Sequence, residues 1–264
     1  MAARLSRFVG GLRIGADFFE HAGALAPPSP GVAEPRGVVD RMADLSSPGV
    51  DPDRVHPAIA RFFDDTASLE LRVVSRWRFP ASIVWPIART FMRAIGQFVL
   101  PRRTARIATR VARLDPAADG RDGIAPRAIV RTYEGSGEVM QAVAYGTARF
   151  GDASLMSAVF PMPGGHVWGR LRLEATGEDA EGRLSVALTS EGPHAGVFLV
   201  LGGVALPSPF GERLALWSPK MSHCPEDLDP EVASGATLVG RHEQRFLGFR
   251  FVVHDYGFAP RDGG

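Results

Sequence analysis

The sequence has very little cysteine and lysine: Cys224 and Lys220 are the only examples among 264 residues. A single cysteine excludes an intramolecular disulfide bond and a zinc site built from several cysteines. No run of about 18 apolar residues occurs, so we expect no membrane-spanning segment. Residues 1–15 contain scattered arginines and no uninterrupted apolar core, which argues against a secretory signal. These absences predict a soluble, cytoplasmic protein.

Common catalytic and cofactor-binding motifs are also absent. The chain contains no G-x-S-x-G, no H-E-x-x-H and no P-loop sequence. The glycine pairs Gly164-Gly165 and Gly202-Gly203 do not precede a predicted helix, so they are not phosphate-binding loops. We therefore expect no cofactor and no metal ion. The net charge of +1 argues against a nucleic-acid partner.

Alternation of apolar and polar residues is the strongest structural signal. It is clearest over 154–174, where two predicted strands are joined by a Pro-Gly-Gly turn at 163–165. Further segments of this kind follow residue 104, separated by turn-forming residues: 104–114, 127–134, 139–150, 154–161, 166–175, 182–190, 195–202, 213–218, 236–247 and 249–256. Short connections predict antiparallel pairing, and about ten twisted strands curl into a strongly curved sheet or barrel. The predicted fold class is mainly β (α+β).

Two helices are expected before these strands. A shorter N-terminal helix begins near Asp53, which can cap it, and a strand follows over Leu69–Phe79. Residues 82–100 predict one long amphipathic helix with Ile87 and Phe91 on its apolar side. Such a helix is expected to pack against the sheet or to cross the mouth of a barrel.

Composition divides the chain into three parts. Residues 1–52 are rich in glycine, proline and alanine and predict an irregular N-terminal arm. Residues 53–260 form a single β-rich domain, and 261–264 form a tail. The oligomeric state is left open.

Two histidines near the C-terminus are the catalytic candidates. His242 precedes Glu243, and His254 precedes Asp255. A histidine beside a carboxylate can act as a general acid or base. Both histidines fall on the same side of their strands unless a turn or bulge between them changes the register. A structural or surface role is the alternative for each.

A second group of residues predicts a ligand site. His166, Trp168 and Arg170 lie on one face of a strand, and in a barrel that face can form a polar lumen for an anionic or amphipathic ligand. Tyr145 and Tyr256 complete the predicted ligand-binding set. The alternative is that the face lies outside, with Trp168 stacked on Arg170.

A basic run accompanies the long helix and is formed by Arg89, Arg93, Arg102 and Arg103. It can contact an anionic membrane surface, and the alternative is a solvated helix face.

Several segments resemble one known group of proteins. The matching positions are Phe62, Phe63, Thr66, Trp77, Arg89, Arg93 and Pro101, followed by 159–163 and 182–190. Over residues 56–202 the pattern is similar to that of an uncharacterised bacterial family related to the soluble domain of YndJ-like proteins. The resemblance implies no activity and no catalytic residues. The N-terminal arm and the loop 219–235 lie outside it.

Three functions remain open. The first is a binding module for a small hydrophobic or amphipathic molecule inside the barrel, which requires a large apolar cavity with one or two polar anchors. The second is a cofactor-independent isomerase, cyclase or hydrolase that uses His254 or His242 as acid or base and Arg170 as anion clamp. The third is a partner-binding protein that acts through its arm or basic helix, which requires a filled barrel and an exposed apolar patch.

Overall fold

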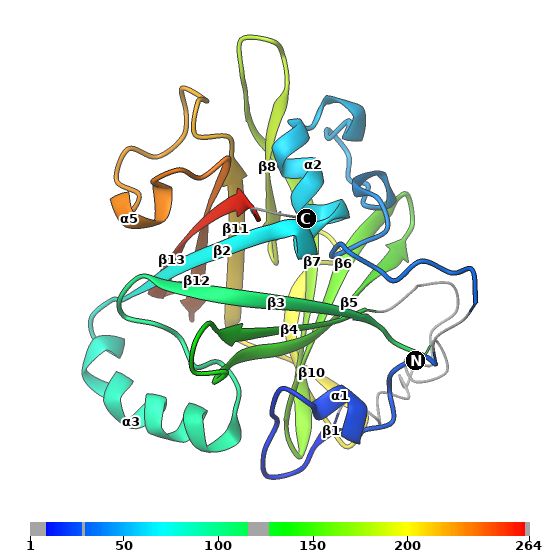
Figure 1. Ribbon diagram of the computed structural model, residues 1–264, viewed down its shortest axis with the longest axis vertical. Helices are drawn as coiled ribbons and strands as arrows, with labels where there is room; N and C mark the ends of the chain where they lie inside the picture. Colours follow the sequence, from blue (N-terminus) through cyan, green and yellow to red (C-terminus); the bar gives the residue numbers. More distant parts are fainter. Residues whose placement is uncertain (1–8, 28–29, 116–126, 262–264) are drawn as a thin grey trace.

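The protein is a closed antiparallel β-barrel of ten strands, described by a computed structural model for residues 9–27, 30–115 and 127–261 (Figure 1). The barrel strands, in spatial order, are β2 (Leu69–Trp77), β3 (Ala105–Arg113), β4 (Arg127–Tyr133), β5 (Val139–Phe150), β6 (Ala153–Pro163), β7 (Gly165–Glu178), β8 (Leu184–Thr189), β11 (Phe210–Trp217), β12 (Leu238–Phe246) and β13 (Phe249–Pro260). β13 pairs with β2 and β6 pairs with β7, which closes the wall. The predicted barrel is confirmed.

Three further strands extend this wall. The hairpin of β9 (Gly196–Leu201) and β10 (Val204–Pro207) continues the sheet beyond β7, and β1 (Val9–Gly10) pairs in parallel with the end of β6. β7 therefore changes partners along its length, because residues 165–170 pair with β9 and residues 172–178 pair with β8.

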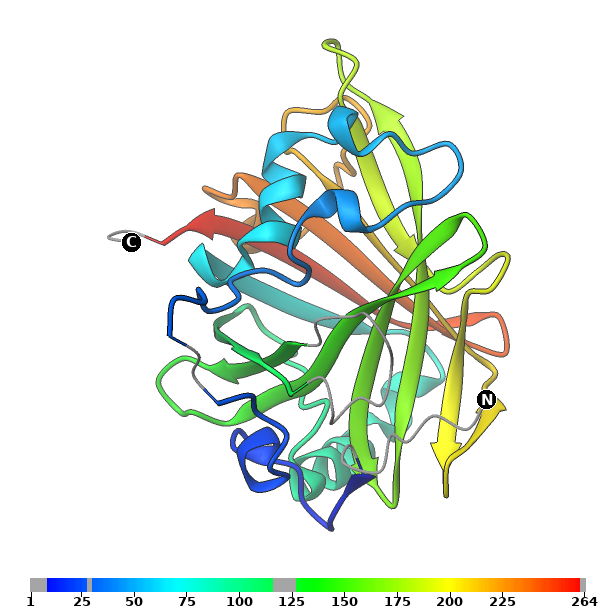
Figure 2. The ribbon, with the colours of Figure 1, turned by 90° about the vertical axis from the view of Figure 1, so that its right-hand side faces the viewer.

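The barrel interior is filled mainly by apolar side chains. α2 (Pro57–Asp64) packs Ile59, Phe62 and Phe63 onto this interior cluster, and Figure 2 shows it across one end of the barrel. His56, rather than the expected Asp53, caps the helix, because its Nδ1 accepts a hydrogen bond from the Ala58 backbone N–H at 3.2 Å. α2 thus closes one end of the core.

The N-terminal arm packs against the barrel. Val38, Met42 and Leu45 join the interior cluster. Ile14 and Phe19, the latter in α1 (Phe18–His21), belong to a second cluster on the outer side of β4, β5 and β6. The remaining short helices are η2 (Met42–Asp44), η3 (Pro52–Arg54), η4 (Thr66–Ser68) and α5 (Pro230–Ala233).

The long helix packs against the sheet, which is one of its two expected placements, but through an unexpected face. α3 (Ala81–Ile95) lies beside β2 and β13, outside the barrel. Trp85 is buried and stacks on Trp77 with ring centroids 4.0 Å apart, which fixes the rotation of the helix. The predicted apolar stripe consequently faces outward, and Ile87 is 77% exposed. Within the described ranges, no helix is long and apolar enough to cross a membrane.

Candidate functional site

A cavity of about 60 Å³ lies inside the barrel. Its apolar wall includes Phe62 of α2, Met156 and Phe160 of β6, and Phe258 of β13. Its polar wall comes from five strands and consists of Arg131, Gln141, Tyr145, Glu212, His242, Gln244, His254 and Tyr256. An apolar cavity of about 150 Å³ is known to accept benzene. Among the described residues, this cavity is therefore smaller and more polar than the large apolar cavity expected of a carrier.

His242 and His254 face each other across β12 and β13. The two residues are register partners, and their ring centroids lie 5.5 Å apart. A register shift between Gln244 and Arg245 lies between the turn and the histidine pair, and it places His242 opposite His254 rather than Val253. Both side chains therefore reach the same cavity.

His254 is an uncharged member of this pair. It is almost fully buried, and its Nδ1 lies 2.8 Å from the hydroxyl oxygen of Ser75 on β2. Burial lowers the pKa of His254 well below its usual value, and the neighbouring His242 lowers it further. His254 is therefore neutral near pH 7.

His242 has a carboxylate partner that the sequence pattern did not indicate. Its Nε2 lies 2.9 Å from Oε2 of Glu212 on β11. Both residues line the cavity. A histidine held by a carboxylate can accept or donate a proton at its free nitrogen. This pair is the arrangement in the cavity best suited to acid–base chemistry.

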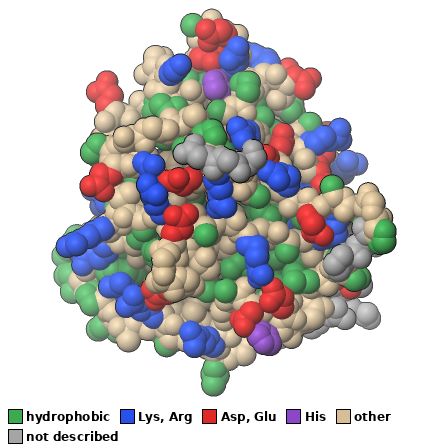
Figure 3. Space-filling model, in the orientation of Figure 1, with side chains coloured by type: hydrophobic (Ala, Val, Ile, Leu, Met, Phe, Trp, Pro, Cys, Tyr) green, Lys and Arg blue, Asp and Glu red, His purple; other side chains and the backbone are tan. Residues whose placement is uncertain are grey.

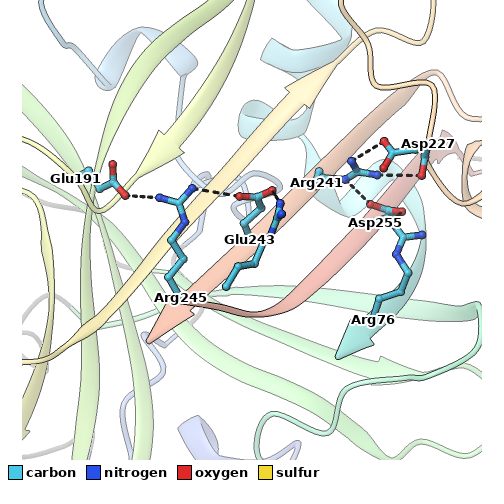
Figure 4. Close-up of polar contacts among 8 residues, drawn as sticks. Arg76, Glu191, Asp227, Arg241, Glu243, Arg245 and Asp255 are labelled. Atoms are coloured by element: carbon cyan, nitrogen blue, oxygen red, sulfur yellow. Dashed lines mark hydrogen bonds and ion pairs between the residues drawn. The ribbon is translucent and has the colours of Figure 1, made fainter. Parts of the chain in front are cut away.

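The carboxylates next to the histidines in sequence point elsewhere. Asp255 lies on the outer side of the sheet, where Arg76 pairs with it and Arg241 Nε donates to its Oδ1 at 2.9 Å (Figure 4). Glu243 pairs with Arg245 and Arg250 on the same outer face. Alternation along a strand separates each of these carboxylates from its neighbouring histidine.

Tyr145 and Tyr256 line the cavity, as their membership of the predicted ligand set requires. Burial raises the pKa of both phenols, and the nearby Arg131 partly opposes that rise. Both side chains are therefore neutral near pH 7 and keep a hydroxyl proton to donate.

Arg131 is the most unusual residue of the cavity wall. It lies on β4 and is only 7% exposed. Its Nε has no hydrogen-bond partner, and in the described ranges no carboxylate forms an ion pair with it. Arginine remains charged when buried, and a buried charge without a partner is costly. The guanidinium of Arg131 thus contributes a positive charge to the cavity wall.

The other three predicted ligand residues do not line the cavity. The expectation that His166, Trp168 and Arg170 face the lumen is wrong, because their neighbour Leu171 faces it and strand alternation turns them outward. The Trp168 indole N–H donates to the Ser157 hydroxyl at 2.9 Å. The guanidinium carbon of Arg170 lies 5.2 Å from the Trp168 ring centroid, which is the stacked alternative. His166 is buried in the wall.

Arg131 and Glu212 were missed by sequence reasoning. One signal was present for Arg131, since it shares a strand face with Ile129 and Tyr133, both of which are mostly buried. An arginine between apolar residues of the same parity indicates an inward-pointing charge. Glu212 precedes the predicted strand 213–218 and offered no comparable signal. Among the described residues, no group of three or more potential ligands suits a metal ion.

The fold and the cavity define a closed antiparallel β-barrel with a mixed polar interior, an architecture compatible with ligand binding. The chain is similar to the "Uncharacterized membrane protein YndJ" of Bacillus subtilis (strain 168), with 27% identity over 172 residues. That alignment covers 63% of this chain and 30% of the relative, so the chain spans less than a third of the relative's length. The match supports relatedness to YndJ-like proteins. No family model and no solved structure matches the chain.

Proposed function

We propose that the barrel binds a small amphipathic anion whose carboxylate or phosphate group pairs with the guanidinium of Arg131. The observation that carries the proposal is a charged side chain, buried in the cavity wall, with no ion pair among the described residues. An anion there would recover the electrostatic free energy that burial of the arginine has removed. Phenol groups of Tyr145 and Tyr256 add hydrogen-bond donors on the same side.

The cavity also limits the ligand. Its volume of about 60 Å³ suits a short-chain acid or the head of a larger amphipath, and the apolar wall from Phe62 and Met156 suits a few methyl or methylene groups. Glu212 carries the opposite charge in the same cavity, but His242 occupies one of its oxygens.

The test is thermal unfolding of the protein with acetate, butyrate and inorganic phosphate as probes. At about one hundred times its dissociation constant, a bound anion raises the free energy of unfolding by about 2.7 kcal/mol. We expect at least one probe to stabilise the protein and Arg131→Met to abolish that effect. Arg127→Met is the matched control, because Arg127 is also buried on β4 but pairs with Asp40 outside the cavity. Stabilisation that survives in Arg131→Met would contradict the proposal.

A second candidate is a cofactor-independent isomerase, cyclase or hydrolase in the same cavity. The pair of His242 and Glu212 favours it, since a histidine oriented by a carboxylate is suited to general acid–base catalysis. In this reading Arg131, rather than Arg170, holds the anionic part of the substrate. Conversion of a bound compound by the protein, and not by His242→Gln, would distinguish an enzyme from a carrier.

A further inference from the structure

The turn between β12 and β13 exposes large apolar side chains. Its sequence is Arg245-Phe246-Leu247-Gly248-Phe249-Arg250. Leu247 is 66% exposed and Phe249 is 79% exposed. Leu247 has a φ of 50° and Gly248 a φ of 81°, a conformation that hairpin turns usually fill with asparagine, aspartate or glycine. Leucine does not favour this turn conformation, so the turn itself does not explain the exposed apolar side chain of Leu247.

The outward face of α3 exposes a second set of apolar side chains. Ile83, Ile87 and Phe91 recur at helical spacing and are all exposed, while Trp85 holds the opposite side of the helix against β2. We define the apolar corner as these three residues together with Phe246, Leu247 and Phe249. Six exposed large apolar side chains in two segments form more than the scattered exposure that is normal for a protein surface.

Aromatic contacts join the two segments. Starting at α3, the ring centroids of successive pairs lie 4.0, 5.9, 5.8 and 4.9 Å apart along Trp85, Trp77, Phe251, Phe210 and Phe246. The hairpin turn between β12 and β13 lies at the edge of the molecule in Figure 2, where it can contact a surface outside the protein. Packed aromatic rings therefore connect the helix to the turn and place the two segments in the same part of the molecule.

Positive charge surrounds the apolar corner. Arg245 and Arg250 bracket the turn, although both have glutamate partners (Figure 4). Near α3 the arginines are unneutralised: Arg78, Arg89, Arg102 and Arg103 are exposed and form no ion pair with any described residue. Figure 3 shows arginines next to hydrophobic side chains over α3, at the lower left of the molecule.

We propose that the apolar corner docks on the surface of an anionic phospholipid bilayer. Phe246, Leu247 and Phe249 enter the headgroup region, and the arginines beside α3 contact lipid phosphates. A projecting apolar turn with arginines on both sides matches an interface that is apolar within and anionic at its surface. A groove for a peptide or a flat face for a second copy would lack this combination. The apolar corner is separate from the interior cavity, so this proposal does not depend on anion binding at Arg131.

The test is flotation of the purified chain with vesicles of phosphatidylcholine alone or mixed with phosphatidylglycerol. We expect binding to the mixed vesicles, weaker binding to phosphatidylcholine, and a decrease with added salt. The triple variant Phe246→Ser, Leu247→Asn, Phe249→Ser should bind at least about tenfold more weakly. Asparagine suits the positive φ at position 247, so this variant keeps the turn. Circular dichroism checks that it folds.

Two further variants sharpen the result. Ile87→Ser with Phe91→Ser tests the α3 part of the corner and should also weaken vesicle binding. Val32→Ser is the matched control, because Val32 is 51% exposed on the N-terminal arm and outside the corner, and it should bind as the unaltered chain does. Absence of vesicle binding, or equal binding by the folded triple variant, would overturn the proposal. A dimer in sedimentation equilibrium that the triple variant dissociates would assign the corner to a second copy instead.

Discussion

At the scale of single residues, the buried charge of Arg131 has a measurable cost. A buried charge without a partner destabilises the fold, and apolar replacements of similar volume at buried charged sites are often stabilising by about 1–4 kcal/mol. We predict that Arg131→Met raises the free energy of unfolding by about 1 kcal/mol or more in the absence of ligand. Urea unfolding measures this change. A large loss of stability would instead mean that Arg131 serves a structural ion pair.

His254 makes a second prediction at this scale, in the pH dependence of stability. Its pKa in the folded protein is depressed below the ordinary value of 6.5. The unfolded chain therefore binds a proton first as the pH falls below 6.5, and the stability that neutral His254 provides is lost by up to about 1.4 kcal/mol per pH unit. Ser75 and His242 face its ring, and neither supplies a negative charge to offset this.

Urea unfolding at about pH 7.5 and at about pH 5 checks this dependence, because the two values lie on either side of the ordinary histidine pKa of about 6.5. We expect His254→Asn to flatten the loss of stability. An equal slope in His254→Asn and the unaltered chain would show that other groups govern the acid response.

At the scale of secondary-structure elements, hydrophobic periodicity predicts that α3 is a helix but not which side of the helix is buried. The pattern predicts an amphipathic helix with Ile87 and Phe91 on one stripe, and the helix forms. Periodicity cannot say which part of a broad apolar face meets the protein. The stack of Trp85 on Trp77 decides this, because it holds the side of the helix opposite to Ile87 and leaves Ile87 and Phe91 outside.

A pair of substitutions on α3 tests this packing. Trp85→Ala removes a buried stacked ring and should lower the free energy of unfolding by about 3–5 kcal/mol. Ile87→Ala, on the opposite side of the helix from Trp85, should change it by less than about 0.5 kcal/mol because its side chain faces solvent. Similar losses in both variants would mean that Ile87 is covered in solution. Chemical denaturation measures both values.

The β12–β13 hairpin is the opposite case, where strand alternation was informative about the site. Equal parity predicted that His242 and His254 share a side unless a turn or bulge intervenes. A turn and a bulge both intervene, and together they leave the two histidines paired directly. Parity also predicted that Asp255 points away from His254. The carboxylate that meets His242 belongs to β11, and only closure of the barrel brings Glu212 there. Local pattern thus located the histidines and could not locate their partner.

At the scale of the whole molecule, strand count and short connections predicted the barrel, because about ten twisted antiparallel strands must curl. The size of the cavity was not predictable. It depends on how α2 and the buried residues of the arm, such as Val38 and Met42, fill the interior, and nothing local in their sequence reveals that packing. The direction of Arg170 stayed open for a related reason: alternation gives two faces and does not say which one is inside.

Native mass spectrometry of the chain and of Arg131→Met, with extraction of whatever co-purifies, tests the central claim most directly. Our account predicts that the unaltered chain retains, at one per barrel, a small compound with a carboxylate or phosphate group. It predicts that Arg131→Met, folded to the same extent, retains none. A bound compound without an acidic group, or equal occupancy in the two proteins, would contradict the assignment of Arg131 as the anchor of the barrel's ligand.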